Sequence, residues 1–399
     1  MCAVASTGNA AYWRAVSAGL CANMVGVGLA RFAYTPLIPA LVAAQWFPPS
    51  AAAYLGAANL AGYVAGALLA RPIALRAGSA SALRTMMTVA AAAFFACALP
   101  LSFGWFFVWR FASGVSGGVL MALAAPVVLA HVPPSQRGLA GGAIFTGVGL
   151  GIAASGTLVP PLVRTGLPQA WLGLGALALV LTAASWSGWP RELPRMARAG
   201  APAPRRRVLV ALYVEYGLNA AGLVPHMLFL VDFVARGLGQ GLVSGARYWV
   251  LFGVGAMLGP LANGRLADRI GFALAFRLAL IVQAACVALL AASAQPWSLT
   301  LSSFVIGAMV PGVVPLVLGR THELLPDDAD QQLKAWGLCT VAFALGQAAA
   351  AYGFSFVFAQ MDGGYRLLYA LGATALGLAL IIDFAAAERA TKQRPAMPG

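Results

Sequence analysis

Long apolar runs alternate with short polar segments along the whole chain. A helix needs roughly 20 apolar residues to cross the hydrocarbon core of a bilayer, and twelve runs are of about that length. Lipid offers the backbone no hydrogen-bond partners and the runs lack the alternation of a membrane β-barrel, so each run is predicted to be a helix. The predicted spans are 14–41, 50–70, 82–102, 105–131, 139–161, 168–188, 208–232, 246–264, 273–292, 297–318, 333–358 and 364–385.

The longest polar stretch is proline-rich and basic, and it runs from Pro190 to Arg207. It leaves six predicted spans on either side, which is the arrangement of a transporter built from two related six-helix bundles. We therefore expect an all-α polytopic membrane protein with two pseudo-symmetric bundles, at 1–189 and 208–388. In this interpretation residues 190–207 form a cytoplasmic linker and residues 389–399 form a cytoplasmic tail.

Composition favours a membrane protein and excludes a soluble one. Hydrophobic residues make up 61% of the 399-residue chain and charged residues 9%, whereas soluble domains carry roughly 25% charged residues. So few charges cannot cover a water-facing surface, and so apolar a chain does not stay disordered. Four of the five cysteines lie in apolar runs, which indicates packing rather than a disulfide framework or a metal site.

Lysine and arginine fall mainly on one side of the predicted topology. Both termini share that side, which carries nineteen of the 25 basic residues, while the opposite side carries four. This bias predicts cytoplasmic termini and an inner-membrane location. The net charge of +14 fits anionic lipid head groups, and no basic stripe with interleaved aromatics indicates a nucleic-acid partner. The tryptophans near span ends are predicted to be interface anchors: Trp13, Trp105, Trp171, Trp189, Trp249, Trp297 and Trp336.

A loop motif occurs at the same place in each half. Residues 264–271 read GRLADRIG, and residues 66–71 read GALLAR, with Ala70 where the later copy has an aspartate. The later copy matches the G-x-L-A-D-R-x-G loop of the major facilitator superfamily, which the chain resembles over its whole length. We expect Asp268 to cap a helix N-terminus and to pair with an arginine across the halves; an ordinary capped loop is the alternative. The predicted gating-loop residues are Gly264, Asp268, Arg269, Gly271 and Arg71.

Two further segments resemble one group within that superfamily. Residues 26–39 read GVGLARFAYTPLIP and residues 344–347 read ALGQ, and both are similar to the YbfB/YjiJ group. The resemblance implies the superfamily fold, a central cavity between the halves, and alternating access by rocking of the two bundles. It implies no particular substrate.

Ionisable groups inside a bilayer are costly, so each is a functional candidate. Arg31 lies seventeen residues after Arg14, about 25 Å along the helix and hence in the outer half of the membrane. The alternative to a substrate contact is snorkelling to the outer interface. Arg110 begins the segment RFASGVSGG, which is similar to the superfamily's span-four arginine motif, tied there to proton coupling. Its alternative role is a bond to helix-end carbonyls.

Glu215 is the predicted proton carrier. It lies eight residues into the seventh span, about 12 Å from the cytoplasmic end, where burial disfavours the charged carboxylate. A structural salt bridge to an arginine on a neighbouring helix is the alternative. Asp232, nearer the outer end of the same span, is the second candidate, and an interfacial position is its alternative.

Polar side chains inside the spans are candidates for substrate binding. Pro36 and Pro39 interrupt span one and Pro225 interrupts span seven. Interruptions at corresponding positions point to a substrate site, although a simple kink is the alternative for each. His226 is also typical of a hydrogen-bonded packing residue. The predicted substrate-binding residues are Arg31, Asn23, Tyr34, Asn59, Asn219, His226 and Gln347.

An acidic cluster precedes span eleven. Residues 327–330 read DDAD, which in isolation suggests a metal or diphosphate site. Asp330 is well placed as a helix N-cap, and no histidine or second acidic motif accompanies the cluster, so the cap is favoured. The sequence has no Walker Gly-Lys-Ser/Thr loop, and we predict no metal, no cofactor and no ATP-driven pump.

These features predict a secondary transporter, and not an enzyme, that moves a small molecule by proton-coupled alternating access. Two buried arginines favour an anionic or polar substrate. Superfamily tendency favours a monomer and export, while import stays open. One rival is a membrane-embedded enzyme acting on a lipid-linked substrate, for which only residues 327–330 offer an acidic cluster. The other is a sensor without flux, for which no loop or tail is long enough to form an output domain.

Overall fold

The computed structural model describes residues 2–190, 206–326, 328–360 and 364–392. Within these ranges all regular secondary structure is helical. Twelve helical segments in the described part of the chain are long and apolar enough to cross a membrane, and they follow the order of the predicted spans. This confirms the prediction of an all-α polytopic membrane protein.

Each half of the chain contributes seven labelled α-helices. The first seven are α1 (Cys2–Asn23), α2 (Tyr34–Ala43), α3 (Pro49–Ala77), α4 (Ser79–Cys97), α5 (Phe103–Leu129), α6 (Arg137–Thr165) and α7 (Leu167–Ser185). The others are α8 (Arg206–Val224), α9 (Leu230–Asp232), α10 (Gly241–Ile270), α11 (Phe272–Ala292), α12 (Pro296–Leu324), α13 (Ala329–Gln360) and α14 (Tyr365–Lys392).

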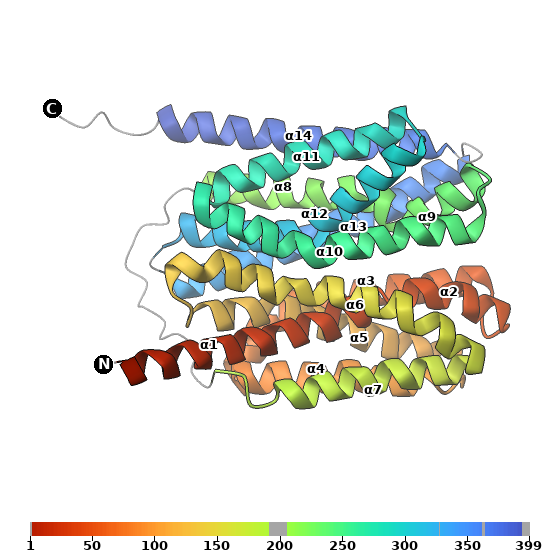
Figure 1. The fold of residues 1–399 in the computed structure, drawn as a ribbon, viewed down its shortest axis with the longest axis horizontal. Helices are drawn as coiled ribbons and strands as arrows, with labels where there is room; N and C mark the ends of the chain where they lie inside the picture. Colours follow the sequence, from red (N-terminus) through yellow and green to blue (C-terminus); the bar gives the residue numbers. More distant parts are fainter. Residues whose placement is uncertain (1, 191–205, 327, 361–363, 393–399) are drawn as a thin grey trace.

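The two halves lie side by side with their helices roughly along the long axis of the molecule (Figure 1). The same packing pattern recurs in both. Helices α3 and α5 pack together as α10 and α12 do, α1 packs on α6 as α8 packs on α13, and α4 packs on α7 as α11 packs on α14. The halves meet through α6 against α10 and through α3 against α13. Pairing of equivalent helices within and between the halves gives the molecule its pseudo-symmetry.

Helix α1 begins and α14 ends at the same end of the molecule, which we call the terminal end (Figure 1). An even number of spans requires this arrangement. Residues 191–205 and 393–399 are not among the described residues. The cytoplasmic linker at 190–207 and the tail at 389–399 therefore stay predictions.

Spans one and seven are both interrupted, as their prolines predict. In span seven a π-helical segment (Pro225–Phe229) begins at the proline itself. In span one a π-helical segment (Met24–Leu29) and a turn at residues 30–33 precede α2, so the interruption lies before Pro36. A proline removes its own N–H and its ring collides with the carbonyl four residues earlier, here that of Phe32, so Pro36 accounts for the turn at residues 30–33 and not for the π-helical segment before it.

The third span lies earlier in the chain than predicted at both of its ends. The apolar run predicts 82–102, whereas α4 runs from Ser79 to Cys97. The helix begins directly after Gly78, whose φ of 78° is readily adopted only by glycine. It ends before Pro100, because a residue that precedes proline is biased away from helical backbone.

Glycine allows the two halves to approach closely along α6 and α10. A Cβ on Gly142 would lie 2.4 Å from the carbonyl oxygen of Pro260, and one on Gly264 would lie 2.2 Å from that of Gly138. Both distances are far below van der Waals contact, so any side chain there would force the helices apart. In a bilayer the hydrophobic effect does not drive helices together, so they associate through close packing, which small residues permit.

Candidate functional site

A small cavity of about 30 Å³ lies between the two halves. Its lining from the first half is Val27, Arg31, Phe32, Tyr63, Met121 and Val148. The lining from the second half includes Tyr216, Met227, Pro311, Trp336, Thr340 and Phe343. Spans one, two, four, five, seven, ten and eleven therefore all contribute to its wall, which is mainly aromatic and aliphatic.

Arg31 is the one charged side chain among the described residues that line this cavity. It lies within the interruption of span one, in the turn at residues 30–33, and its side chain lines the space between the halves. There it donates a hydrogen bond to Oε1 of Gln347, on α13 of the other half. Its guanidinium carbon lies 5.2 Å from the ring centre of Phe32 and 5.5 Å from that of Tyr63. These contacts place the charge in the interior, and not at the outer interface where snorkelling would hold it.

Arg110 lies behind the cavity wall and supports the interruption of span one. It is 3% exposed, and its Nη1 donates to the carbonyl oxygen of Ala30 at 2.8 Å. Its guanidinium lies 4.0 Å from the ring centre of Tyr34. Because Ala30 directly precedes Arg31, Arg110 holds the backbone that carries the cavity's charge. The bond to a carbonyl at a helix interruption, the alternative role that the sequence allowed, is the one observed.

Glu215 lies inside the second half and does not line the cavity. It is 4% exposed and directly precedes Tyr216, which does line the cavity. Successive residues of an α-helix point about 100° apart, so the carboxyl turns away from the cavity. Arg277, Asp383 and Arg320 lie within electrostatic range of it. Within the described ranges no ion pair or hydrogen bond of the Glu215 carboxyl is found, so a direct salt bridge is not observed there.

The remaining polar candidates take part in helix packing. Asn23 donates to the carbonyl oxygen of Gly19 at 3.2 Å, and Asn59 donates to that of Arg110 at 3.2 Å. None of the following four residues is among those that line the cavity: Asn23, Asn59, Asn219 and His226.

Two of these residues form buried contacts within the second half. Asn219 donates to Gln283 at 2.5 Å, and Nε2 of His226 lies 2.7 Å from the hydroxyl of Ser302. The histidine ring also packs edge-on against Tyr369. His226 therefore has the contacts of a hydrogen-bonded packing residue. The side chain of Asp232 lies outside the described part of the structure.

Three tryptophans that the sequence places at membrane interfaces are buried instead, and one of them is Trp189, which is 3% exposed. Trp171 is 1% exposed and packs among aromatic rings of the first half. Trp336 is 1% exposed and donates its Nε1–H to the carbonyl oxygen of Met121, across the halves, at 3.1 Å. Closeness to a span end does not reveal which face of the helix a residue occupies, so the anchor prediction is wrong for all three.

Sequence reasoning also missed most of the cavity wall on α13. Trp336, Thr340 and Phe343 line the cavity, and Gln347 lies four residues further on. Their spacing of four, three and four residues puts all four on one face of a helix. That periodicity, read backward from Gln347, is the signal that identifies them.

Asp268 joins the two halves at the terminal end. Its Oδ1 accepts a hydrogen bond from the backbone N–H of Gly138 and its Oδ2 accepts one from that of Leu139, each at 3.0 Å. These are the first free N–H groups of α6, so the carboxylate of one half caps a helix of the other. The predicted cap is confirmed, although its partner is a helix N-terminus rather than an arginine. The nearby Arg269 is exposed.

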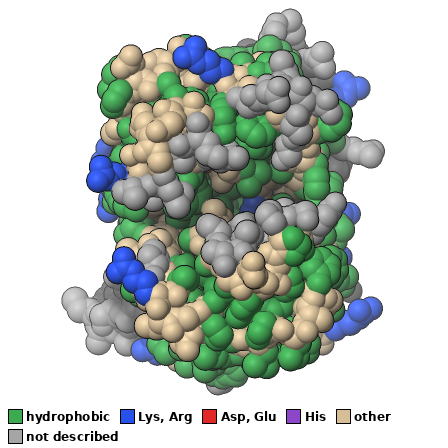
Figure 2. All heavy atoms as spheres, turned by 90° about the vertical axis from the view of Figure 1, so that its right-hand side faces the viewer, with side chains coloured by type: hydrophobic (Ala, Val, Ile, Leu, Met, Phe, Trp, Pro, Cys, Tyr) green, Lys and Arg blue, Asp and Glu red, His purple; other side chains and the backbone are tan. Residues whose placement is uncertain are grey.

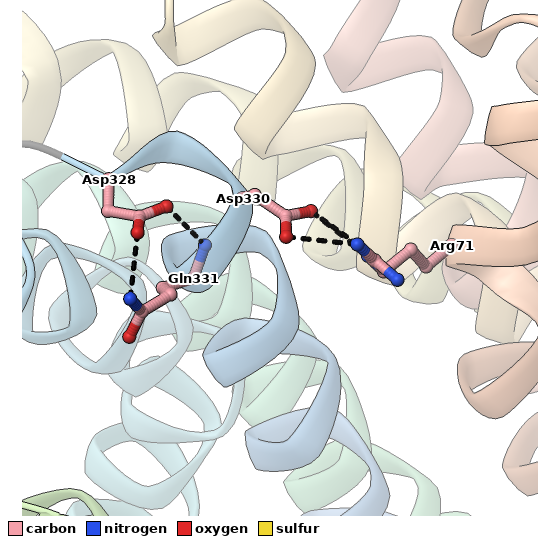
Figure 3. Close-up of polar contacts among 4 residues, drawn as sticks. All are labelled: Arg71, Asp328, Asp330 and Gln331. Atoms are coloured by element: carbon pink, nitrogen blue, oxygen red, sulfur yellow. Dashed lines mark hydrogen bonds and ion pairs between the residues drawn. The ribbon is translucent and has the colours of Figure 1, made fainter. Parts of the chain in front are cut away.

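The first half uses an ion pair at the equivalent place. Arg71 binds Asp330 at the start of α13 through Nε and Nη2, at distances of 2.7–3.0 Å (Figure 3). The arginine that follows Ala70 thus reaches across the halves itself. Asp330 is not the N-cap that the sequence predicts. Asp328 is, since its Oδ1 accepts from the backbone N–H of Gln331 at 2.9 Å and α13 begins one residue after it.

The opposite end of the molecule carries few charges. Figure 2 looks onto that end, where the described side chains are mainly hydrophobic or uncharged and a hollow separates the two halves. The described contacts between the halves that involve a carboxylate lie at the terminal end. Within the described ranges no group of three or more His, Cys, Asp or Glu side chains gathers as a metal site would require.

Comparisons with known proteins agree with this architecture. A family model described as "Uncharacterised MFS-type transporter YbfB" matches residues 23–384. Among solved structures, the human organic anion transporter MFSD10 superposes with a TM-score of 0.72 at 17% identity, covering 93% of this chain and 99% of its own.

The sugar transporters superpose equally well. FucP in its outward conformation gives a TM-score of 0.72 at 14% identity, covering 93% of this chain and 98% of its own. The proton:xylose symporter XylE gives 0.70 at 14% identity, with 95% and 96% covered. Identities this low show a shared fold. A search of curated proteins finds no match.

Proposed function

We propose that this chain, which belongs to the YbfB family of MFS-type transporters, moves a small anionic or polar molecule through the central cavity. The movement of protons drives this transport. The observation that carries the proposal is Arg31, a guanidinium with no described acidic partner in a cavity built by both halves. Because the family is one of transporters, the chain works in transport and not as an enzyme.

Alternating access follows from where the halves are joined. The Asp268 cap, the Arg71–Asp330 pair and the Trp336–Met121 bond all cross between the halves. The basic bias of the terminal end makes it the cytoplasmic side of the inner membrane in our proposal. Rocking of the halves would break these bonds and open the cavity to the cytoplasm, while closing the hollow at the other end.

Glu215 is proposed as the proton-carrying group. Its carboxyl is buried among helices of the second half, near the Arg277–Asp383 ion pair and Arg320. Gain or loss of a proton changes the charge of this carboxyl, which lies among three neighbouring helices. The change in charge therefore alters how the helices of the second half pack. Arg110 would then contribute by fixing the Arg31 backbone, and Asp232 stays the second proton candidate.

The names of two solved relatives agree with an anionic substrate and with proton coupling. One is an organic anion transporter and another a proton symporter, although their low identity assigns nothing to this chain directly. We expect a monomer, because both halves of the proposed pathway come from one chain, and we favour export on superfamily tendency.

Purified protein in liposomes tests the proposal. Inward gradients of hippurate, xylose or ethidium are imposed in turn, and a dye inside the vesicles reports pH. We expect one solute to move protons in the wild-type protein and Glu215→Gln to abolish that movement. The matched control is Glu323→Gln, an exposed carboxyl at the terminal end that bonds only within its own half. If no solute moves protons, or if both variants behave alike, the proposed coupling is wrong.

A further inference from the structure

We infer that the substrate is a monovalent organic acid whose carboxylate replaces the Gln347 amide on Arg31 while its apolar body lies against the aromatic wall. This inference rests on the proposed function, because it names the substrate of that same cavity. Four features support it: the charge balance of the cavity, the geometry of the Arg31–Gln347 bond, the second contact of Gln347, and the composition of the wall.

The charge balance calls for one negative charge. Arg31 is the sole charged residue among the described cavity lining, and no described carboxylate forms an ion pair with it. The faces of Phe32 and Tyr63 compensate the cation in part. A cation held away from water is costly unless it is paired. A monoanion supplies that pair, whereas a dianion leaves one charge unpaired and a cation adds repulsion.

The geometry of the Arg31–Gln347 bond shows where the carboxylate binds. A guanidinium presents a planar fork of N–H donors that matches the two oxygens of a carboxylate. Gln347 offers this fork one neutral acceptor, Oε1, which bonds to Nη2. A carboxylate makes two charge-assisted bonds in the same place, so it displaces the amide. Gln347 thus acts as a neutral occupant of the site when no substrate is bound.

The second contact of Gln347 is weak, which makes displacement easy. Its Nε2 lies 3.3 Å from the sulfur of Met227, which lines the cavity from span seven. A thioether is a poor acceptor, so turning the amide away from Arg31 loses little on this side. The Arg31–Gln347 bond also joins the two halves, and substrate binding therefore removes one link between them.

The cavity wall selects the body of the acid. Five aromatic rings face the cavity: Phe32, Tyr63, Tyr216, Trp336 and Phe343. The indole N–H of Trp336 and the hydroxyl of Thr340 donate to backbone carbonyls, so the polar side chains left on the described wall are Arg31 and the hydroxyls of Tyr63 and Tyr216. A sugar needs many hydrogen bonds and finds few here, whereas a flat apolar body fits such a surface.

Matched ligands and two isosteric variants test the inference. Hippurate, hippuramide, hexanoate and succinate are titrated at one pH into full-length protein in nanodiscs, and binding is followed by calorimetry. Wild-type protein should bind hippurate at least about tenfold more tightly than its amide and than succinate. Gln347→Glu places a carboxylate on Arg31 within the chain itself, so it should weaken hippurate at least about tenfold and leave hippuramide unchanged. Gln347→Leu removes the occupant and should bind hippurate as tightly as the wild type or more so.

Three results overturn the inference. The first is equal binding of hippurate and hippuramide by the wild type, and the second is wild-type affinity for hippurate in Gln347→Glu. The third is that the wild type binds neither hippurate nor hexanoate at millimolar concentration. If Gln347→Glu fails to fold, the comparison of hippurate with hippuramide in the wild type and the affinity of Gln347→Leu for hippurate still test the inference. Failure of the proposed function gives a different result. Hippurate binding without proton movement refutes the coupling alone, whereas proton-driven transport of xylose or ethidium that survives Arg31→Ala refutes the acid substrate alone.

Discussion

The Asp268 cap offers a sharp test of how the halves are held together. Asp268→Ala removes an acceptor from both the Gly138 and Leu139 N–H groups. Loss of a capping side chain costs about 0.5–2 kcal/mol. Because Asp268 is exposed and its charge is screened by solvent, we expect about 1 kcal/mol. That energy lowers the ratio of the state closed at the terminal end to the open state about fivefold. Asp268→Asn keeps one acceptor oxygen and should give an intermediate effect.

Spin-label distances report this population directly. Labels at Ser81 and Leu274, exposed positions on the first turns of α4 and α11, in a variant without native cysteines, follow the separation of the halves. Asp268→Ala should raise the fraction at long distance. The matched control is Glu323→Ala, which removes a carboxylate bond to the backbone N–H of Phe272 within one half. An unchanged distribution in Asp268→Ala, or an equal shift in the control, would refute the reasoning.

Two further predictions concern the same interface. Gly142→Val places a side chain against the Pro260 carbonyl and should shift the label distances toward separation or lower the melting temperature; Gly156→Val, with no atom within 4 Å of its Cβ position, should do neither. Arg71→Asp should open the terminal end by repulsion from Asp330, and Asp330→Arg added to it should restore the closed population. Failure of the double variant to recover would show that the pair contributes no specific attraction.

The sequence predicts the fold well because bilayer physics acts locally. An apolar run in lipid must form a helix whatever it packs against, because its backbone groups have to bond within the run itself. The interruption at Pro225 is equally local, and it appears where the proline stands. The interruption of span one covers residues 24–33, and only its last part lies within reach of Pro36, since a proline disturbs the carbonyl four residues upstream.

Contacts between distant segments are less predictable. Arg31 and Gln347 each stand out as polar residues in apolar spans, but their 316-residue separation hides that they bond. The Arg71–Asp330 pair is hidden in the same way, because the loop motif of the first half lacks the aspartate that would suggest a contact. Burial of Trp336 depends on which face of α13 meets Met121, and position near a span end carries no such information.

The central claim is that a proton on Glu215 drives a solute through the cavity. Its most direct test compares, in liposomes, accumulation driven by a pH gradient with exchange at equal pH, for the solute that moves protons in the wild-type protein. We expect Glu215→Gln to lose accumulation and to keep exchange, because the cavity is intact while the coupling group is neutral. Accumulation that persists in Glu215→Gln would contradict it.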